Sequence, residues 1–177
     1  MERRILTIGA VGGAAGALVM VVFAMIAAAT YQHTGFFTPL YHIASPIIGT
    51  DTMMRSMGTT YFTAGPALLG LAVHLMVGIV FGALFGFVAS RVGVRGVAAV
   101  PIGIVYGLVV MLFMANVGLP ITAAVLRGGD MVSDMASLVG WGTFTAEHAI
   151  YGLILGAIWA AWGVTVARVR ASAGARA

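Results

Sequence analysis

The chain has 177 residues, of which 61% are hydrophobic and only 8% are charged. A water-soluble domain normally carries about 25% charged residues, so nine basic and five acidic side chains are too few to cover a soluble domain. This composition excludes a disordered chain, a collagen-like fibre and a free-standing soluble enzyme. It predicts a single transmembrane domain over residues 1–177.

The placement of the charges points to lipid as the main partner. All nine basic residues are arginines that stand singly or in pairs between long apolar runs, so the net charge of +4 does not indicate nucleic acid binding. The chain has no cysteine, which excludes disulfides, thiolate metal ligands and a thiol nucleophile.

Four apolar runs are long enough to cross a bilayer, which takes about 20 helical residues. They cover residues 5–29, 62–90, 97–119 and 141–167, and they leave loops at 30–61 and 120–140. The first run is longer than the apolar core of a signal peptide, so we expect a retained helix. The predicted fold is all-α, an integral membrane four-helix bundle.

The arginines set the predicted orientation, because cytoplasmic segments of membrane proteins are enriched in basic residues. Both termini and the turn between the second and third runs then lie in the cytoplasm of a bacterium, and the protein is multi-pass in the inner membrane. The cytoplasmic arginines would be Arg3, Arg4, Arg91, Arg95, Arg168, Arg170 and Arg176, and the outer ones Arg55 and Arg127.

The second half of the sequence resembles the first. HLMVGIVFG from His74 and HAIYGLILG from His148 share the pattern His-x-x-x-Gly-x-x-x-Gly. GALVMVVFAM from Gly16 likewise resembles GLVVMLFMAN from Gly107. Because both halves begin on the cytoplasmic side, we expect two parallel two-helix repeats related by an axis along the membrane normal.

Glycines recur at intervals of four residues on every predicted helix. Small residues at this spacing let helix backbones approach closely in lipid. The pattern therefore favours packing within the bundle, with a homodimer or larger membrane complex, or space for a flat cofactor, as alternatives. The glycines are Gly12, Gly16, Gly78, Gly82, Gly86, Gly103, Gly107, Gly152 and Gly156.

The histidines are the main candidates for a site, because ionisable residues inside membrane spans usually have a function. His74 and His148 fall in the outer half of their helices, and His33 and His42 lie in the first outer loop. In one interpretation, neutral His74 and His148 form hydrogen bonds with other helices.

Two further interpretations involve a cofactor or a metal. His74 and His148 are candidate axial ligands of a b-type haem, although both share faces with the glycines, which leaves little space for a porphyrin. His33 and His42, with the outer methionines, are candidate copper ligands, since imidazole and thioether groups suit copper.

The second to fourth predicted helices carry a family resemblance. VHLMVGIVFGALFGFVASRV is followed by a third helix ending in MANVGLP and a fourth with a histidine near its start. In these features the chain resembles the YagU-type proteins, a bacterial family of small four-helix inner-membrane proteins. The resemblance implies an inner-membrane location and transfers no site residues.

Known catalytic and nucleotide-binding motifs are missing from the sequence, including the P-loop and His-Glu-x-x-His. We therefore expect a non-enzymatic membrane protein or an accessory subunit with an outer-side histidine site. The alternative is a bis-histidine b-type haem protein that passes electrons in the membrane.

Overall fold

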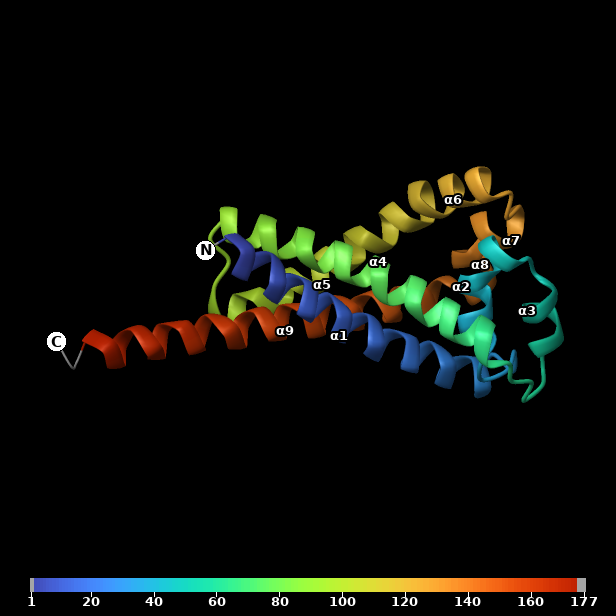
Figure 1. The fold of residues 1–177 in the computed structure, drawn as a ribbon, viewed down its shortest axis with the longest axis horizontal. Helices are drawn as coiled ribbons and strands as arrows, with labels where there is room; N and C mark the ends of the chain where they lie inside the picture. The colour runs from blue at the N-terminus through green and yellow to red at the C-terminus, as the bar shows by residue number, and fades with distance from the viewer. Residues whose placement is uncertain (1, 175–177) are drawn as a thin grey trace.

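The computed structural model describes residues 2–174, and for residues 164–174 only the course of the backbone. The described chain is helical and has no strand (Figure 1). Four of its helical segments are long and apolar enough to cross a membrane: α1 (Glu2–Ala29), α4 (Ala64–Arg91), the segment Gly96–Leu126, and α9 (Trp141–Gly174) over Trp141–Gly163. The predicted all-α fold with four spans is confirmed.

The third span continues past the predicted end at residue 119. It consists of η1 (Gly96–Ala98), α5 (Ala99–Phe113), the π-helical turn η2 (Met114–Gly118) and α6 (Leu119–Leu126). Pro120 lies in the first turn of α6 and has no N–H to donate. The wider π turn lets the helix continue past this proline with a bend rather than a break.

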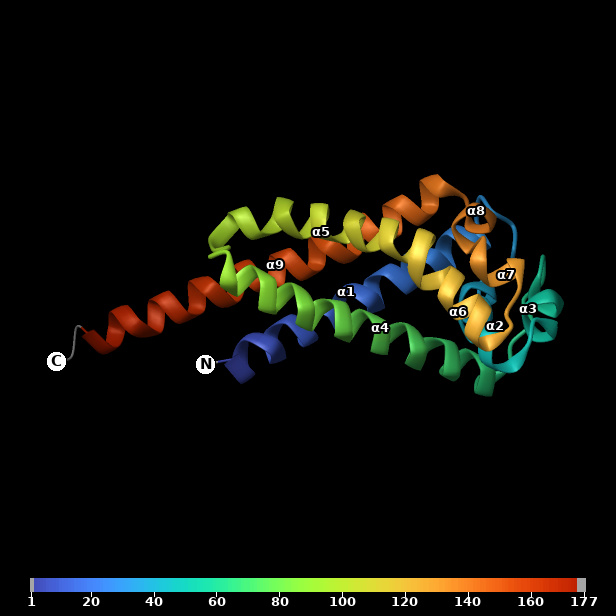
Figure 2. The same cartoon turned by 90° about the horizontal axis from the view of Figure 1, so that it is seen from above.

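Four short helices gather at one end of the bundle, which we call the capped end (Figures 1 and 2). They are α2 (Thr38–Ile48), α3 (Asp51–Ser56), α7 (Asp130–Ser133) and α8 (Met135–Val139). A buried cluster with Val21, Tyr41 and Met53 joins α2 and α3 to α1 and α4. A second cluster with Val132 and Phe144 joins α7 and α8 to α6 and α9.

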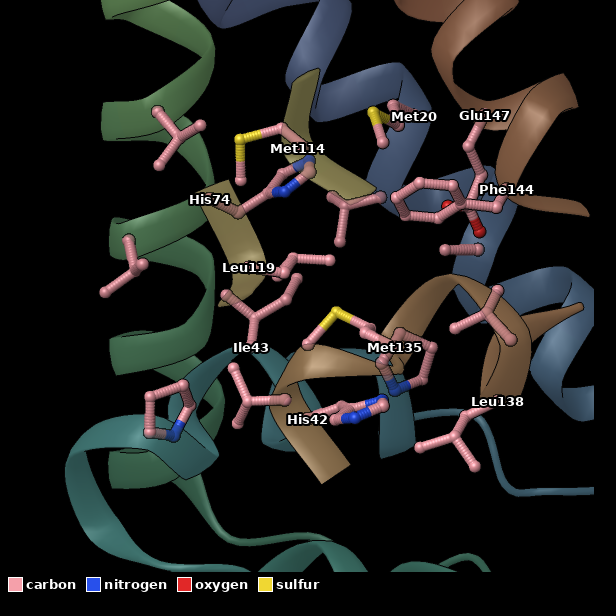
Figure 3. A pocket seen from close by; sticks show the side chains of 18 of the residues that line it. Met20, His42, Ile43, His74, Met114, Leu119, Met135, Leu138, Phe144 and Glu147 are labelled. Atoms are coloured by element: carbon pink, nitrogen blue, oxygen red, sulfur yellow. The ribbon is translucent and has the colours of Figure 1, made fainter. Parts of the chain in front are cut away.

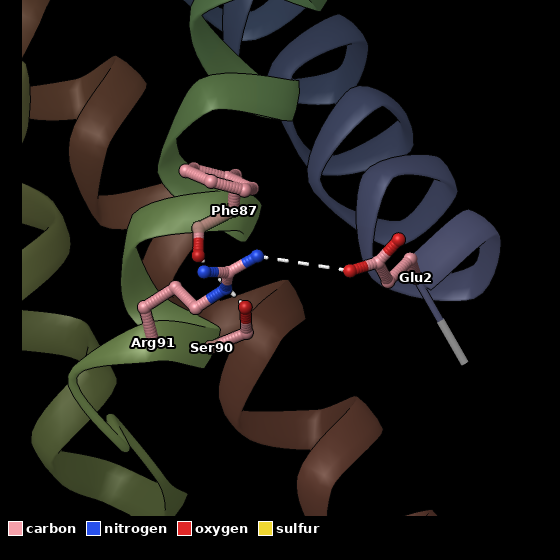
Figure 4. A network of polar contacts seen from close by, with 4 residues as sticks. All are labelled: Glu2, Phe87, Ser90 and Arg91. Atoms are coloured by element: carbon pink, nitrogen blue, oxygen red, sulfur yellow. Dashed lines mark hydrogen bonds and ion pairs between the residues drawn. The ribbon is translucent and has the colours of Figure 1, made fainter.

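The start of α1 and the turn after α4 lie at the opposite end, where Glu2 and Arg91 form an ion pair at 3.6 Å (Figure 4). The Arg91 guanidinium also lies 4.7 Å from the centre of the Phe87 ring. Both charged side chains are exposed, so this pair contributes little to stability. It does show that α1 and α4 are antiparallel neighbours.

The arginines divide between the two ends as the orientation argument requires. Arg3, Arg4, Arg91 and Arg95 lie at the end opposite the cap, and Arg55 and Arg127 lie at the capped end. Arg168 and Arg170 lie where only the backbone is described, and Arg176 lies outside the described residues.

The glycines allow two pairs of helices to pack backbone to backbone. In the pair α1 and α4, a Cβ on Gly13 would overlap the carbonyl oxygen of Gly78. In the pair α5 and α9, a Cβ on Gly103 would overlap the carbonyl oxygen of Gly152. The predicted role of the glycines in packing within the bundle is therefore confirmed.

The two helix pairs meet through α1 and α9, and through aromatic contacts between α4 and α5. The Tyr106 hydroxyl donates a hydrogen bond to the Phe81 carbonyl oxygen at 2.7 Å, and the Tyr106 ring lies 5.1 Å from that of Phe85. Towards the capped end, beyond these contacts, α6 bends away from α4 (Figure 1). The bend widens the space between the two pairs.

Large apolar side chains cover the outer surface of the spans, as lipid contact requires. Exposed examples come from α1, α4 and α5: Val11, Leu18, Leu68, Met76, Val80, Val105 and Leu112. Such a surface is unsuited to water and indicates a multi-pass membrane protein.

Candidate functional site

A cavity of about 320 Å³ lies at the capped end, between the four spans and the short helices (Figure 3). This volume is within the range of small-molecule sites, about 300–1,000 Å³. Its walls are mainly aliphatic side chains and methionines. The methionines are Met20, Met53, Met57, Met114, Met131 and Met135.

Three of the four histidines singled out from the sequence line this cavity. His74 projects from α4, His148 lies on α9 and His42 comes from α2 in the cap. The structure thus brings His74 and His148 to one cavity. It leaves His33 exposed and outside the cavity lining.

The described residues contain no cluster of ligands that would support the metal-site hypothesis. Among the described residues, no group of three or more His, Cys, Asp or Glu side chains is arranged to hold a metal ion. His42 lines the cavity while His33 does not, so their joint role as copper ligands stays a prediction.

Each cavity histidine donates one hydrogen bond to a backbone carbonyl oxygen. The Nε2–H of His74 donates to Ala17 in α1 at 2.9 Å, and the Nδ1–H of His148 donates to Phe144 at 2.8 Å. The Nε2–H of His42 donates to Met131 at 2.6 Å. Because a carbonyl oxygen only accepts, these contacts fix the tautomers and leave a lone pair on the other ring nitrogen. This arrangement suits neutral histidines.

The hydrogen bond of His42 ties the two parts of the cap together, since His42 lies in α2 and Met131 in α7. Burial lowers the pKa of His42 below its usual value, and the hydrogen bond to the Met131 carbonyl opposes this effect only in part. His42 is therefore neutral at pH 7 and can keep an acceptor nitrogen.

Glu147, which stands beside His148 in the sequence and is there a candidate for proton relay with either histidine, also belongs to this site. It is only 6% exposed, lines the cavity, and projects beside the Phe144 ring (Figure 3). Among the side chains that the structure describes, Glu147 has neither an ion-pair partner nor a hydrogen bond. Its oxygens still touch open space, which here is the cavity. A signal was present, because Glu147 is an acidic residue within an apolar run.

The bent third span supplies the remaining wall. Met114 from η2, with Leu119 and Thr122 from α6, lines the cavity opposite His74 and Val77 of α4. Because α6 belongs to the helix that continues past Pro120, this wall was not foreseen from the sequence.

Comparison with known proteins assigns neither a family nor a function, because no protein-family model, no curated protein and no solved structure matches the chain. The resemblance to the YagU-type family stays a prediction. The function must therefore be argued from the cavity.

Proposed function

We propose that this protein is a multi-pass protein of the bacterial inner membrane that binds a small, largely apolar molecule in the cavity at its capped end. The observation that carries this proposal is the cavity itself, with apolar walls and a few convergent polar groups. Among the described residues, no hydroxyl donates a hydrogen bond to the remaining nitrogen of the three cavity histidines, as an activated nucleophile would, which favours binding over catalysis.

We also infer that the two halves are parallel repeats with the cavity between them. Gly13 packs on Gly78 in the first half as Gly103 packs on Gly152 in the second. In this packing Gly13 of α1 corresponds to Gly103 of α5. The sequence alignment of Gly16 with Gly107 instead pairs Gly12 with Gly103, so the two correspondences differ by one residue. The packing puts His74 and His148 at equivalent positions, one on each side of the proposed axis.

The capped end is proposed to face outward, and the arginine-rich end the cytoplasm. Because the chain has no cysteine, single cysteines can report this orientation. In intact bacterial spheroplasts, a membrane-impermeant maleimide should label Ser137→Cys in the cap. It should label Val92→Cys, in the turn after α4, only after permeabilisation. The reverse pattern would place the cavity on the cytoplasmic side.

Filling the cavity should block binding. Val77 of α4 lines the cavity, whereas Val80, one turn further along, is 60% exposed on the outer surface. In nanodiscs corrected for empty discs, Val77→Phe should weaken saturable binding of naphthylmethanol by about tenfold or more, because the added ring occupies the cavity. Val80→Phe is the matched control and should bind like the wild type. Equal binding by both variants would count against the cavity as the site.

A haem protein is the second candidate, and one observation favours it. A histidine that donates one ring N–H to a backbone carbonyl and keeps the other nitrogen free is typical of metal ligands, and His148 does so. The two histidines are not equivalent in this respect, since the Nε2 of His74 is bonded to Ala17 and only its Nδ1 is left, whereas His148 keeps Nε2. We expect purified protein incubated with haemin to show no bound Soret band. A band that shifts on reduction and is lost in His148→Ala would favour the haem protein.

A further inference from the structure

Glu147 is the acidic side chain in the lining of the cavity. Its carboxyl group is buried, faces the cavity and has no partner of opposite charge among the side chains that the structure describes. A buried carboxylate is strongly disfavoured unless a cation or hydrogen-bond donors accompany it. The protein supplies neither at this position, so the empty cavity favours the protonated, neutral carboxyl group, and a ligand that brings a positive charge would stabilise the carboxylate.

Most of the other polar groups of the cavity have already used their hydrogens; within the described chain, the Thr34 hydroxyl is an exception, since it forms no hydrogen bond. Besides the three histidines, Tyr151 donates to the Gly78 carbonyl oxygen at 2.8 Å, and Thr122 to that of Gly118 at 2.8 Å. The amide nitrogen of Gln32 donates to the Val139 carbonyl oxygen at 2.6 Å. What these residues can still offer a ligand is lone pairs: imidazole nitrogens, hydroxyl oxygens and an amide oxygen.

From these two observations we propose that the ligand is an organic ammonium ion with an apolar body. The N–H groups of an ammonium donate to the free acceptors, its charge matches Glu147, and its body contacts the methionine and aliphatic walls. This inference rests on the proposed function and names the ligand class of the same cavity.

Two other ligand classes suit the cavity less well. An anion would find few donors, the Thr34 hydroxyl and the O–H of a protonated Glu147, among a larger set of acceptors, and it would repel an ionised Glu147. A bare metal ion would need several ligands in close geometry, and the described residues hold no such group of acidic or histidine side chains.

The proposal is tested with three probes that share one apolar body. Naphthylmethylamine is a cation at pH 7.5, naphthylmethanol is neutral and naphthoic acid is an anion. Saturable binding of each is measured on the full chain in nanodiscs, with empty discs as background. We expect the amine to bind at least about tenfold more tightly than the alcohol, and the acid more weakly still.

The variant Glu147→Gln keeps the shape of the side chain and removes its charge. It should erase the preference for the amine over the alcohol. Asp134→Asn is the control, because Asp134 is exposed outside the cavity and its loss should leave the preference intact.

The outcomes separate this inference from the proposed function. Saturable, Val77→Phe-sensitive binding of all three probes with equal affinity would overturn the ammonium proposal and leave the cavity as a binding site. No saturable binding of any probe would overturn both. If Glu147→Gln does not fold, the affinities of the three probes for the wild-type protein still show whether the cavity prefers an ammonium ion.

Discussion

Replacing Gly82 with leucine is expected to destabilise the bundle more than any other single change considered. A Cβ at this position would overlap the Gly9 carbonyl oxygen and lie 2.5 Å from the Cα and 2.8 Å from the nitrogen of Gly13. These are backbone atoms, which cannot move without separating α1 from α4. Since helices in lipid associate through close packing, we expect a loss of more than about 3 kcal/mol in the free energy of unfolding.

The control for this change is Gly65→Leu in the first turn of the same helix. A Cβ at Gly65 meets no atom within 4 Å, so stability should change by no more than about 1 kcal/mol, and helix propensity favours leucine over glycine. Thermal unfolding of both variants in detergent measures the difference. If Gly82→Leu melts at the wild-type temperature, α1 and α4 do not pack as the structure has them.

The second large effect is expected for Trp159→Ala. Trp159 is only 4% exposed, and its ring lies 5.9 Å from that of Phe85 and 5.2 Å from that of Trp162. Its Nε1–H donates to the Val94 carbonyl oxygen at 3.1 Å, which ties α9 to the turn after α4. Truncation leaves a cavity and an unsatisfied carbonyl, which together destabilise by about 3–5 kcal/mol.

Trp141→Ala provides the comparison, because Trp141 is 49% exposed at the start of α9. It should lower stability by about 1 kcal/mol or less. Denaturation in mixed detergent micelles, followed by circular dichroism, measures both variants. Equal losses for the two tryptophans would show that the cluster around Trp159 does not hold the two helix pairs together.

The spans were predictable because their signal is carried by consecutive residues. Length and hydrophobicity of each run decide whether it crosses a bilayer, and neither depends on the rest of the fold. The bend at Met114–Gly118 was not predictable in the same way. A proline such as Pro120 ends a helix or bends it according to the packing around it.

The short helices of the capped end show the same limit of prediction from sequence. The spacing of Met131, Met135 and Leu138 is typical of one helix with an apolar face, but the structure divides this segment at Asp134 into α7 and α8. Side-chain periodicity does not report such a local break. That the cap covers a cavity depends on contacts between distant segments, such as that of His42 with Met131.

The site was predicted in part. The repeated His-x-x-x-Gly pattern placed His74 and His148 at similar depth, and both line the cavity. The sequence indicated Glu147 as a candidate for proton relay beside His148, but not its surroundings, because these depend on which side chains the fold brings to the carboxyl group. Only the folded arrangement shows that these neighbours bring no cation to it.

The most direct test of the binding site is photo-cross-linking with a benzylamine that carries a trifluoromethyl diazirine. The probe is activated on the wild-type protein in nanodiscs, and the modified residues are mapped by mass spectrometry. If the cavity is the site, modification should concentrate on its lining, at Phe144, Glu147 and Met135, and should decrease in Val77→Phe. Modification spread over lipid-facing positions such as Val80 and Val105, and unchanged in that variant, would contradict a binding site at the capped end.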